Sequence, residues 1–429
     1  MERILTRWLD IPDLRKIDVY LANNGYKAAR KAYFEMSTDQ IINEVKNSNL
    51  RGRGGAAFPT GVKWSFIPKD SKKPVYVCVN GDESEPGTFA NRYQFENDPH
   101  GIIEGILIAC RAVSSHTAYI YMRGEFAEQR RSLDAALAEA RSAGYLGKNV
   151  MGSGYDVDIW PHRGAGAYVC GEESALLESL EGKRGYPRNR PPFPAIVGAF
   201  GCPTVINNVE TLANVPHILN RGADWYKAIG PEKSPGTKLV CVSGHVNKPG
   251  LYELPMGMPM KDIIYDVAGG ILGGKTLKGV IPGGSSFPVL NKEESERAIF
   301  DFDSMRTIGS AMGSGVIIVI DEDTCMIDML LATARFYHHE SCGQCTPCRE
   351  GTGWIEKIMT EMEAGQGKIE QLELLNNISD NMVGNTICVL ADSIAMPVKS
   401  YVTKFRNEFE EHIRLGRCPF KTASAQQAA

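Results

Sequence analysis

Residues 75–87 read VYVCVNGDESEPG. The alternation of valine with Tyr76 and Cys78 predicts a buried strand, and the glycines and acids that follow predict a loop at its carboxyl end. Strand and helix patterns then alternate along the chain, at 75–79, 99–113, 118–122, 125–141, 156–160 and 171–181. This alternation predicts an α/β layer fold with a largely parallel sheet.

Length and composition are those of a globular chain of several domains. The 429 residues predict about two to four domains. Because 47 Lys+Arg face 51 Asp+Glu, the chain lacks the basic excess of a dedicated nucleic-acid binder. No apolar run reaches the ~18–20 residues that a membrane helix needs. The N-terminus lacks the apolar segment of a secretory signal, so we expect a reducing cytoplasm.

Composition shifts divide the chain into segments. We expect a helical segment at 1–60 that ends in a glycine-rich loop, and the α/β domain at 61–228. A short β-rich unit with glycine turns, read as a β-grasp domain, follows at 229–322, and helical spacing of apolar residues predicts a bundle at 323–421. The tail, 422–429, has no anchoring residue and is expected to be disordered.

Three cysteines in the predicted bundle form the strongest motif. Cys342, Cys345 and Cys348 stand at Cys-x-x-Cys-x-x-Cys spacing, which wraps one loop around three corners of a [4Fe–4S] cluster and requires a distant fourth thiolate. Zinc is the alternative, although structural zinc sites usually draw two ligands from each of two short motifs. The neighbouring His338 and His339 point in different directions on a helix, and we expect them to be helix-surface or packing residues rather than ligands of one ion.

The fourth thiolate has two candidates, between which spacing alone does not decide. Cys388 enters a helix among apolar neighbours that would shield a cluster, and Cys418 precedes a proline as in ferredoxins but lies near the end of the chain, where we expect fraying. The remaining cysteines are scattered among apolar residues and are expected to be inert packing groups: Cys78, Cys110, Cys170, Cys202, Cys241 and Cys325.

A glycine-rich loop precedes the α/β pattern. Residues 51–64 read RGRGGAAFPTGVKW; glycines let backbone N–H groups approach a phosphate or a flat ring, and Lys63 adds a positive charge. The loop leaves a helix, so it is not the dinucleotide fingerprint, which follows a strand. A flexible hinge is the alternative.

Two further loops carry polar side chains at strand ends, where open α/β sheets bind ligands. In the first, Asp82, Glu83 and Glu85 either stay solvated or accept hydrogen bonds from ribose hydroxyls, a carboxamide or a flavin ring nitrogen. In the second, residues 163–174, two glutamates would compete with a phosphate at a helix N-terminus. We therefore expect the phosphate to bind elsewhere and Tyr168 to cover a ring.

A third polar loop, residues 207–211, offers amide and hydroxyl donors at the start of another helix. These donors make it the better seat for a phosphate. An ordinary asparagine helix cap is the alternative interpretation.

These motifs, in this order, resemble one family. From about Leu9 to Pro419 the chain is similar to the NADH-binding flavoprotein subunit of respiratory complex I (NADH:quinone oxidoreductase) and to its relatives in NAD-linked hydrogenases and formate dehydrogenases. The likeness runs through the glycine-rich loop, 80–87, 164–174, the PPFP segment at 191–194, 207–211 and the cysteine triplet. It implies a Rossmann-like FMN and NADH domain, a β-grasp (ubiquitin-like) domain and a helical bundle with an iron–sulfur cluster.

The resemblance also implies the ligand residues. FMN would be held by Gly52, Gly54, Lys63, Asn80, Asp82, Glu83, Gly171, Glu172, Asn207, Asn208 and Thr211. NADH would meet Phe58, Phe66, Glu85, Tyr168, Glu173, Arg190 and Phe193, with the adenine between the phenylalanines. The [4Fe–4S] cluster would be held by Cys342, Cys345, Cys348 and, by family position, Cys388. Ala57, Gly81 and Arg190 depart from the residues usual in the family, which have Gly, Ala and Lys there.

The implied activity is electron input by NADH dehydrogenation. NADH gives up a hydride and a cluster accepts single electrons, so a flavin converts between them and no side chain is expected as acid or base. The implied partners are a thioredoxin-like [2Fe–2S] subunit and a large multi-cluster iron–sulfur subunit, on the cytoplasmic side of the inner membrane rather than in a mitochondrial matrix. The alternatives are a diaphorase subunit of a hydrogenase or formate dehydrogenase, and a non-catalytic cluster-bearing scaffold.

Overall fold

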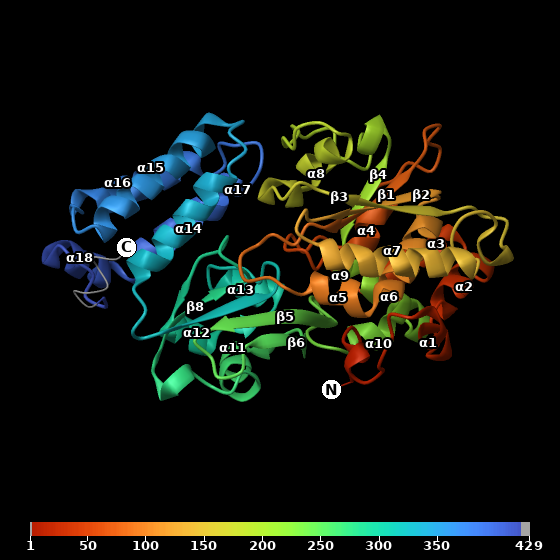
Figure 1. Cartoon of the computed structure of the whole chain (residues 1–429), viewed down its shortest axis with the longest axis horizontal. Coiled ribbons are helices and arrows are strands. Elements are labelled where there is room, and N and C mark those ends of the chain that lie inside the picture. The colour runs from red at the N-terminus through yellow and green to blue at the C-terminus, as the bar shows by residue number, and fades with distance from the viewer. Residues whose placement is uncertain (1, 422–429) are drawn as a thin grey trace. The chain divides into compact units, whose positions relative to one another are not determined.

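The computed structural model describes residues 2–421, so the predicted disordered tail lies outside the described residues. The chain forms two compact units (Figure 1). Within the described residues, the first unit comprises 2–84, 88–240 and 251–257, and the second comprises 85–87, 241–250 and 258–421. Each unit is described by itself.

The first unit is built on a parallel sheet. Its four strands are β1 (Tyr76–Gly81), β2 (Thr117–Met122), β3 (Asp158–Arg163) and β4 (Thr204–Asn208), in the order β3-β2-β1-β4. Every pairing is parallel. Because β2 and β4 lie on opposite sides of β1, the order reverses between β1 and β4, and open sheets bind ligands in the crevice at such a reversal.

Helices of the first unit pack closely on this sheet. α6 (Pro99–Ala112) is buried along nearly its whole length and contacts both β1 and α9 (Val209–Arg221). A Cβ at Gly105 would stand 2.2 Å from the Leu212 carbonyl oxygen, so this glycine permits the close approach of α6 and α9.

The other helical segments of the first unit are η1 (Arg7–Leu9), α1 (Ile17–Ala22), α2 (Lys27–Phe34), α3 (Thr38–Asn47), α4 (Thr60–Ser65), α5 (Asn91–Asn97), α7 (Ala127–Ser142), η2 (Val150–Gly152), η3 (Tyr168–Gly171), α8 (Glu173–Leu180), η4 (Ala199–Gly201) and α10 (Ala223–Lys227).

A small mixed sheet opens the second unit. β5 (Thr237–Gly244) pairs in parallel with β11 (Val316–Asp321) through its second half, β11 pairs antiparallel with β8 (Leu277–Pro282), and β8 with β9 (Leu290–Asn291). The edge strand of this sheet, in the order β6-β5-β11-β8-β9, is β6 (Gly250–Pro255), of which residues 251–255 belong to the first unit. The other elements of the second unit before the helices are β7 (Met258–Pro259), α11 (Met260–Asp262), η5 (Ile263–Val267), η6 (Leu272–Gly274), α12 (Lys292–Arg297), β10 (Ile299–Phe300) and α13 (Phe302–Thr307).

Five helices complete the second unit. They are α14 (Met326–Glu340), α15 (Thr346–Glu363), α16 (Glu370–Met382), α17 (Leu390–Lys404) and α18 (Arg406–Leu415), drawn in blue shades in Figure 1. α14 packs on α15 and α16 on α17, and buried side chains such as Leu330, Ile355 and Ile394 form the core between them. Within residues 2–421, none of the helices combines the length and the apolar character needed to cross a membrane.

The predicted fold class is confirmed, although element boundaries differ, as two of the elements illustrate. The helix expected at 171–181 begins at Glu173, because the Glu172 carboxylate accepts hydrogen bonds from the Ser174 and Ala175 amides and caps the helix. The strand expected at 156–160 runs from Asp158 to Arg163. It lies at the edge of the sheet, where exposed side chains such as Trp160 weaken the alternating signal.

Candidate functional site

The predicted flavin residues of the first unit meet where the strand order reverses. β1 and β4 pair so that Asn80 stands beside Asn208 at the carboxyl ends of both strands. The Asn80 side-chain amide donates to the Gly171 carbonyl oxygen at 2.8 Å, and its Oδ1 accepts from the Asp82 amide at 3.0 Å. Asn80 therefore ties the end of β1 to the turn that precedes α8.

The glycine-rich loop lies against the start of α9. The Arg53 amide donates to the Thr211 hydroxyl at 2.8 Å, and a Cβ at Gly54 would stand 3.0 Å from the Asn208 Cβ. Inside the loop, the Gly52 amide donates to the Phe58 carbonyl oxygen at 2.9 Å. These contacts hold the loop against the start of α9 and favour the ligand-loop interpretation over a flexible hinge.

Buried Arg53 anchors this loop, a role that the sequence did not predict. Its side chain is 1% exposed and donates to the Tyr226 hydroxyl at 2.9 Å and to the Pro235 carbonyl oxygen at 2.7 Å. The loop motif contains Arg53, but its fixed partners come from distant residues that no local pattern connects to it.

Lys63 projects from α4 toward the end of β4. Its ammonium group donates to the Ile206 carbonyl oxygen at 3.0 Å and lies 3.3 Å from the Glu173 carboxylate. Arg190 donates to the other oxygen of Glu173 at 3.1 Å. Arg190 also lies 3.6 Å from the Glu172 carboxylate, so two cations face two carboxylates here, and Lys63 is the cation held at the end of β4.

Glu83 is buried, so the solvated interpretation is wrong for this carboxylate. It accepts hydrogen bonds from the backbone amides of Ala90, Asn91 and Arg92, at 2.6–3.1 Å, where α5 begins. Burial raises the pKa of the Glu83 carboxyl group, and the three amides and the Arg92 side chain oppose that rise. Glu83 thus holds the strand-end loop in place.

The other two acids of that loop have separate partners. The Ser84 hydroxyl donates to the Asp82 carboxylate. Glu85 belongs to the second unit, where its carboxylate accepts from the Ser286 amide at 2.9 Å and from the Ser285 hydroxyl at 3.2 Å.

Two helix N-termini near the crevice are capped by the chain itself. The Glu172 carboxylate accepts hydrogen bonds from the backbone amides at the start of α8. A phosphate would have to compete with this carboxylate there, as the sequence predicted. Asn208 caps α9 by accepting from the Glu210 amide at 2.9 Å, so the ordinary-cap interpretation holds for its Oδ1. Asn207 accepts from the Trp64 indole at 2.8 Å. The amide groups of both asparagines are therefore held in fixed orientations.

Aromatic rings stand exposed on the first unit. Phe58 and Phe66 are 43% and 53% exposed, and their ring centroids lie 6.0 Å apart with planes inclined at 53°. Phe193 is also exposed, and Tyr168 is half-buried in η3. Exposed aromatic faces are costly in water, and the open Phe58–Phe66 pair offers them to a flat partner.

In the second unit, Cys342 and Cys345 lie in the connection between α14 and α15, and Cys348 lies in the first turn of α15. Gly343 turns the loop with φ +78°, and Arg349 closes it by donating to the Gly343 carbonyl oxygen at 2.8 Å. The Ser341 hydroxyl lies 3.3 Å from the Cys348 sulfur, and the Ile387 amide donates to the Cys345 sulfur at 3.4 Å. This last contact brings the segment next to Cys388 onto the loop.

The arrangement of the triplet fits a cluster better than a single ion. Ligands of a tetrahedral zinc ion lie about 3.8 Å apart, and in the part of the chain that the structure describes, the triplet does not form a group of donor atoms within 4.8 Å of one another. A cubane gives each thiolate its own iron, so its ligands stand wider apart. Burial and the neighbouring thiols of Cys342 and Cys345 raise the pKa of the Cys348 thiol.

The structure contradicts the fraying that we expected at Cys418. Cys418 is 1% exposed and lies with Cys325 and His412, so it is not at a frayed end. Cys388 is half-buried, and of its apolar neighbours Leu390 is buried whereas Val389 is 67% exposed, so the expected shielding is partial. The paired histidines are exposed on α14, which is the surface alternative of the two that the sequence left open, and His338 is hydrogen-bonded to Glu356.

Family comparisons cover most of the chain. The Nuo51 FMN-binding domain matches residues 45–217, the SLBB domain matches 238–319, and the NADH-ubiquinone oxidoreductase-F iron-sulfur binding region matches 328–412. The FMN-binding match thus contains the β1/β4 crevice, and the iron-sulfur match contains the cysteine loop.

Whole-chain relatives agree with these matches. The F 2 subunit of NADH-quinone oxidoreductase in Rhizobium meliloti is 52% identical over 98% of this chain and 99% of its own length. The corresponding F subunit in Streptomyces coelicolor is 48% identical over 98% of this chain and 93% of its own. A crystal structure of NAD⁺-reducing [NiFe]-hydrogenase is similar with a TM-score of 0.83 and 35% identity, over 100% of this chain and 70% of that one. The chain therefore belongs to the family of NADH-quinone oxidoreductase F subunits.

Proposed function

We propose that this electron-input subunit holds FMN in the crevice between β1 and β4, and that the chain there receives the hydride of NADH. The observation that carries the proposal is the convergence of the glycine-rich loop, Asn80, Asn208 and Lys63 on the point where the strand order reverses. FMN, when bound, accepts the two electrons of a hydride and releases them singly.

The residues of the crevice suit the parts of FMN. Lys63 supplies a cation for the phosphate, and Gly52 and Gly54 allow the backbone to approach the ligand without a Cβ. The amide groups of Asn80, Asn207 and Asn208 offer donors and acceptors to the polar edge of a flavin ring. The other residues assigned to this cradle are Asp82, Glu83, Gly171, Glu172 and Thr211.

Several contacts support a preformed cradle. Glu83 fixes the start of α5, Glu172 the start of α8, and Thr211 the Arg53 amide of the loop. Each of these polar groups accepts hydrogen bonds from backbone amides that border the crevice. We therefore assign them the role of holding the crevice in shape.

NADH is assigned to the exposed side of the crevice. The open Phe58–Phe66 pair and exposed Phe193 offer stacking faces to the adenine ring. Glu173 and Arg190, which bind each other, and Tyr168 lie on the loops around the start of α8 and are assigned to the nicotinamide half. Glu85 is assigned to the same substrate by its family position alone.

The [4Fe–4S] cluster is assigned to Cys342, Cys345, Cys348 and Cys388. The hydrogen bond from the Ile387 amide to the Cys345 sulfur supports Cys388, because it places the neighbouring residue on the loop. The family's iron-sulfur region, 328–412, spans these four cysteines and ends before Cys418.

The chain works in a multi-subunit complex, and we assign it a thioredoxin-like [2Fe–2S] subunit and a large multi-cluster subunit as partners, on the cytoplasmic side of the inner membrane. Electrons would leave through them for quinone. We retain the segment boundaries 60, 228, 322 and 421 as domain limits. Similarity to a NAD⁺-reducing hydrogenase favours a diaphorase subunit as the second candidate function.

A visible spectrum of the purified chain before and after anaerobic NADH tests this function. We expect a flavin band over a broad iron–sulfur absorbance, with the flavin band bleached by NADH. After denaturation, chromatography should identify the released flavin as FMN. Release of FAD, or a flavin band that NADH leaves unchanged, would contradict the proposal.

A further inference from the structure

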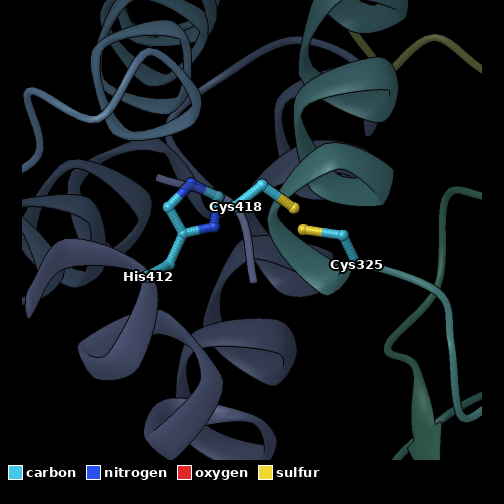
Figure 2. Close-up of side chains that lie close together, drawn as sticks. All are labelled: Cys325, His412 and Cys418. Atoms are coloured by element: carbon cyan, nitrogen blue, oxygen red, sulfur yellow. The ribbon is translucent and has the colours of Figure 1, made fainter. Parts of the chain in front are cut away.

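A second group of metal-ligating side chains lies apart from the cysteine triplet within the second unit. The donor atoms of Cys325, His412 and Cys418 lie within 4.8 Å of one another, and all three residues are buried. Figure 2 shows the two sulfur atoms side by side and the His412 ring with one nitrogen turned toward them. In the described residues 2–421 this is the one group of three such donors at that spacing.

Three elements bring these side chains together. Cys325 is the residue that caps the start of α14, His412 lies in α18, and Cys418 follows α18. Glu363, the last residue of α15, adds a carboxylate 3.8 Å from the His412 Nε2. The group therefore joins the C-terminal segment to the two helices that flank the cysteine loop.

Unsatisfied polar atoms point to a missing ligand. His412 is 0% exposed, and in the described chain neither of its ring nitrogens makes a well-formed hydrogen bond, the Glu363 backbone and carboxylate being its nearest acceptors. The Glu363 Oε2 atom is also buried without one, while Lys421 binds the other oxygen at 2.6 Å. A buried imidazole with two idle nitrogens is costly, and proteins seldom retain one unless an ion or water completes it.

We propose that Cys325, Cys418 and His412 bind a zinc ion. Two sulfurs and an imidazole nitrogen form the donor set that zinc prefers, and ligands on tetrahedral zinc lie about 3.8 Å apart, which small rotations reach from the present spacing.

The proposal also satisfies the remaining groups. The His412 nitrogen that faces the sulfurs would bind the ion, and the Nε2–H would donate to Glu363, the usual way in which a carboxylate orients a ligating histidine. Each thiol loses its proton to solvent as its sulfur–zinc bond forms, so two thiolates balance the ion's charge. A water molecule completes the fourth position.

The role that follows is structural. The ion would fasten the segment after α18 to the start of α14, the helix whose other end leads into the cysteine loop. Since the site uses none of the flavin or cluster residues, it stands independently of the proposed electron transfer.

Elemental analysis of the full chain, with zinc supplied during expression, tests the site. We expect about one zinc per chain beside the cluster iron, reduced at least tenfold in Cys418→Ser and in His412→Gln, with iron unchanged. Cys241→Ser is the matched control, a buried cysteine of the same unit outside the group, and it should retain zinc. Zinc lost equally in the control, or iron lost with zinc in Cys418→Ser, would overturn the proposal.

X-ray absorption at the zinc edge of the unaltered protein keeps the test valid if the variants fail to fold. Two sulfur and two nitrogen or oxygen ligands would support the site. Four sulfur ligands would place the zinc on the cluster cysteines and overturn it. A Cys325–Cys418 disulfide in zinc-free protein isolated without reductant, found by mass spectrometry, would also overturn it.

Discussion

The candidate sites of the two units differ in how far the chain holds them in place. In the first unit, the assigned flavin residues are bound to one another or to backbone at the edge of the crevice, as with Asn80 to Gly171 and Thr211 to Arg53. In the second unit, hydrogen bonds from Arg349 to Gly343 and from Ile387 to Cys345 hold the cysteine loop, and Cys342, Cys345 and Cys388 are half-buried. The first site is preorganised by its own hydrogen bonds, and we expect the second to gain much of its rigidity from its metal.

Removal of the cluster should produce the largest difference between the units. With the iron removed by a chelator, we expect proteolytic cleavage to rise at least tenfold within 341–349 and 384–389, because loops without a metal have little to hold them. Amide exchange in β1 and β4 should stay unchanged. Equal loosening of both units would break the comparison.

Loss of the Glu83 carboxylate should damage the preorganised site next. Glu83→Ala leaves three backbone amides at the start of α5 without their acceptor, two of them on buried residues. We expect the free energy of unfolding to fall by about 3 kcal/mol, measured by urea denaturation. Glu83→Gln keeps one acceptor oxygen and should lose less than half of that. Equal losses in both variants would show that the charge, and not the hydrogen bonding, matters.

Lys63 tests whether the crevice holds the flavin phosphate. Lys63→Ala removes a charge-assisted contact, and we expect flavin affinity to fall about tenfold, measured by retention of FMN during dialysis. Lys69→Ala is the control, since Lys69 is exposed and pairs with Asp39. Unchanged retention in Lys63→Ala would place the phosphate elsewhere.

The smallest expected effect concerns the backbone of the glycine-rich loop. Ala57 adopts a left-handed φ of +55°, which an L residue rarely takes. Ala57→Gly relieves this strain, which stabilises the folded state, but it also raises the conformational entropy of the unfolded chain. Because the first effect is the larger, we expect the free energy of unfolding to rise by about 0.5 kcal/mol. Ala56→Gly, without a left-handed φ, should lose stability. A loss in both variants would show that the loop stores no strain.

The sequence predicted the parallel sheet and the cysteine loop because both have local signals. Alternating strand and helix patterns identify β1 through α8, and the Cys-x-x-Cys-x-x-Cys spacing identifies the triplet. Long-range packing has no such signal. Burial of Cys418 beside Cys325 joins residues 93 positions apart (418 minus 325), and the cap that Glu83 provides for α5 depends on how the loop folds back. Those features required the structure.

The same reasoning explains why Cys388 needed the structure. Its apolar neighbours in the sequence predicted shielding, yet Val389 points to solvent. What connects this segment to the triplet is one hydrogen bond from the Ile387 backbone to the Cys345 sulfur, and a backbone group carries no sequence signal.

Cys388→Ala tests most directly the claim that the flavin site stands without the cluster. Electron paramagnetic resonance of the reduced variant should lack the [4Fe–4S] signal, while FMN content and NADH-driven reduction of ferricyanide stay close to those of the unaltered protein. The matched Cys418→Ser variant should keep both the signal and the FMN. An intact cluster signal in Cys388→Ala together with its loss in Cys418→Ser, or loss of FMN along with the cluster, would contradict the account.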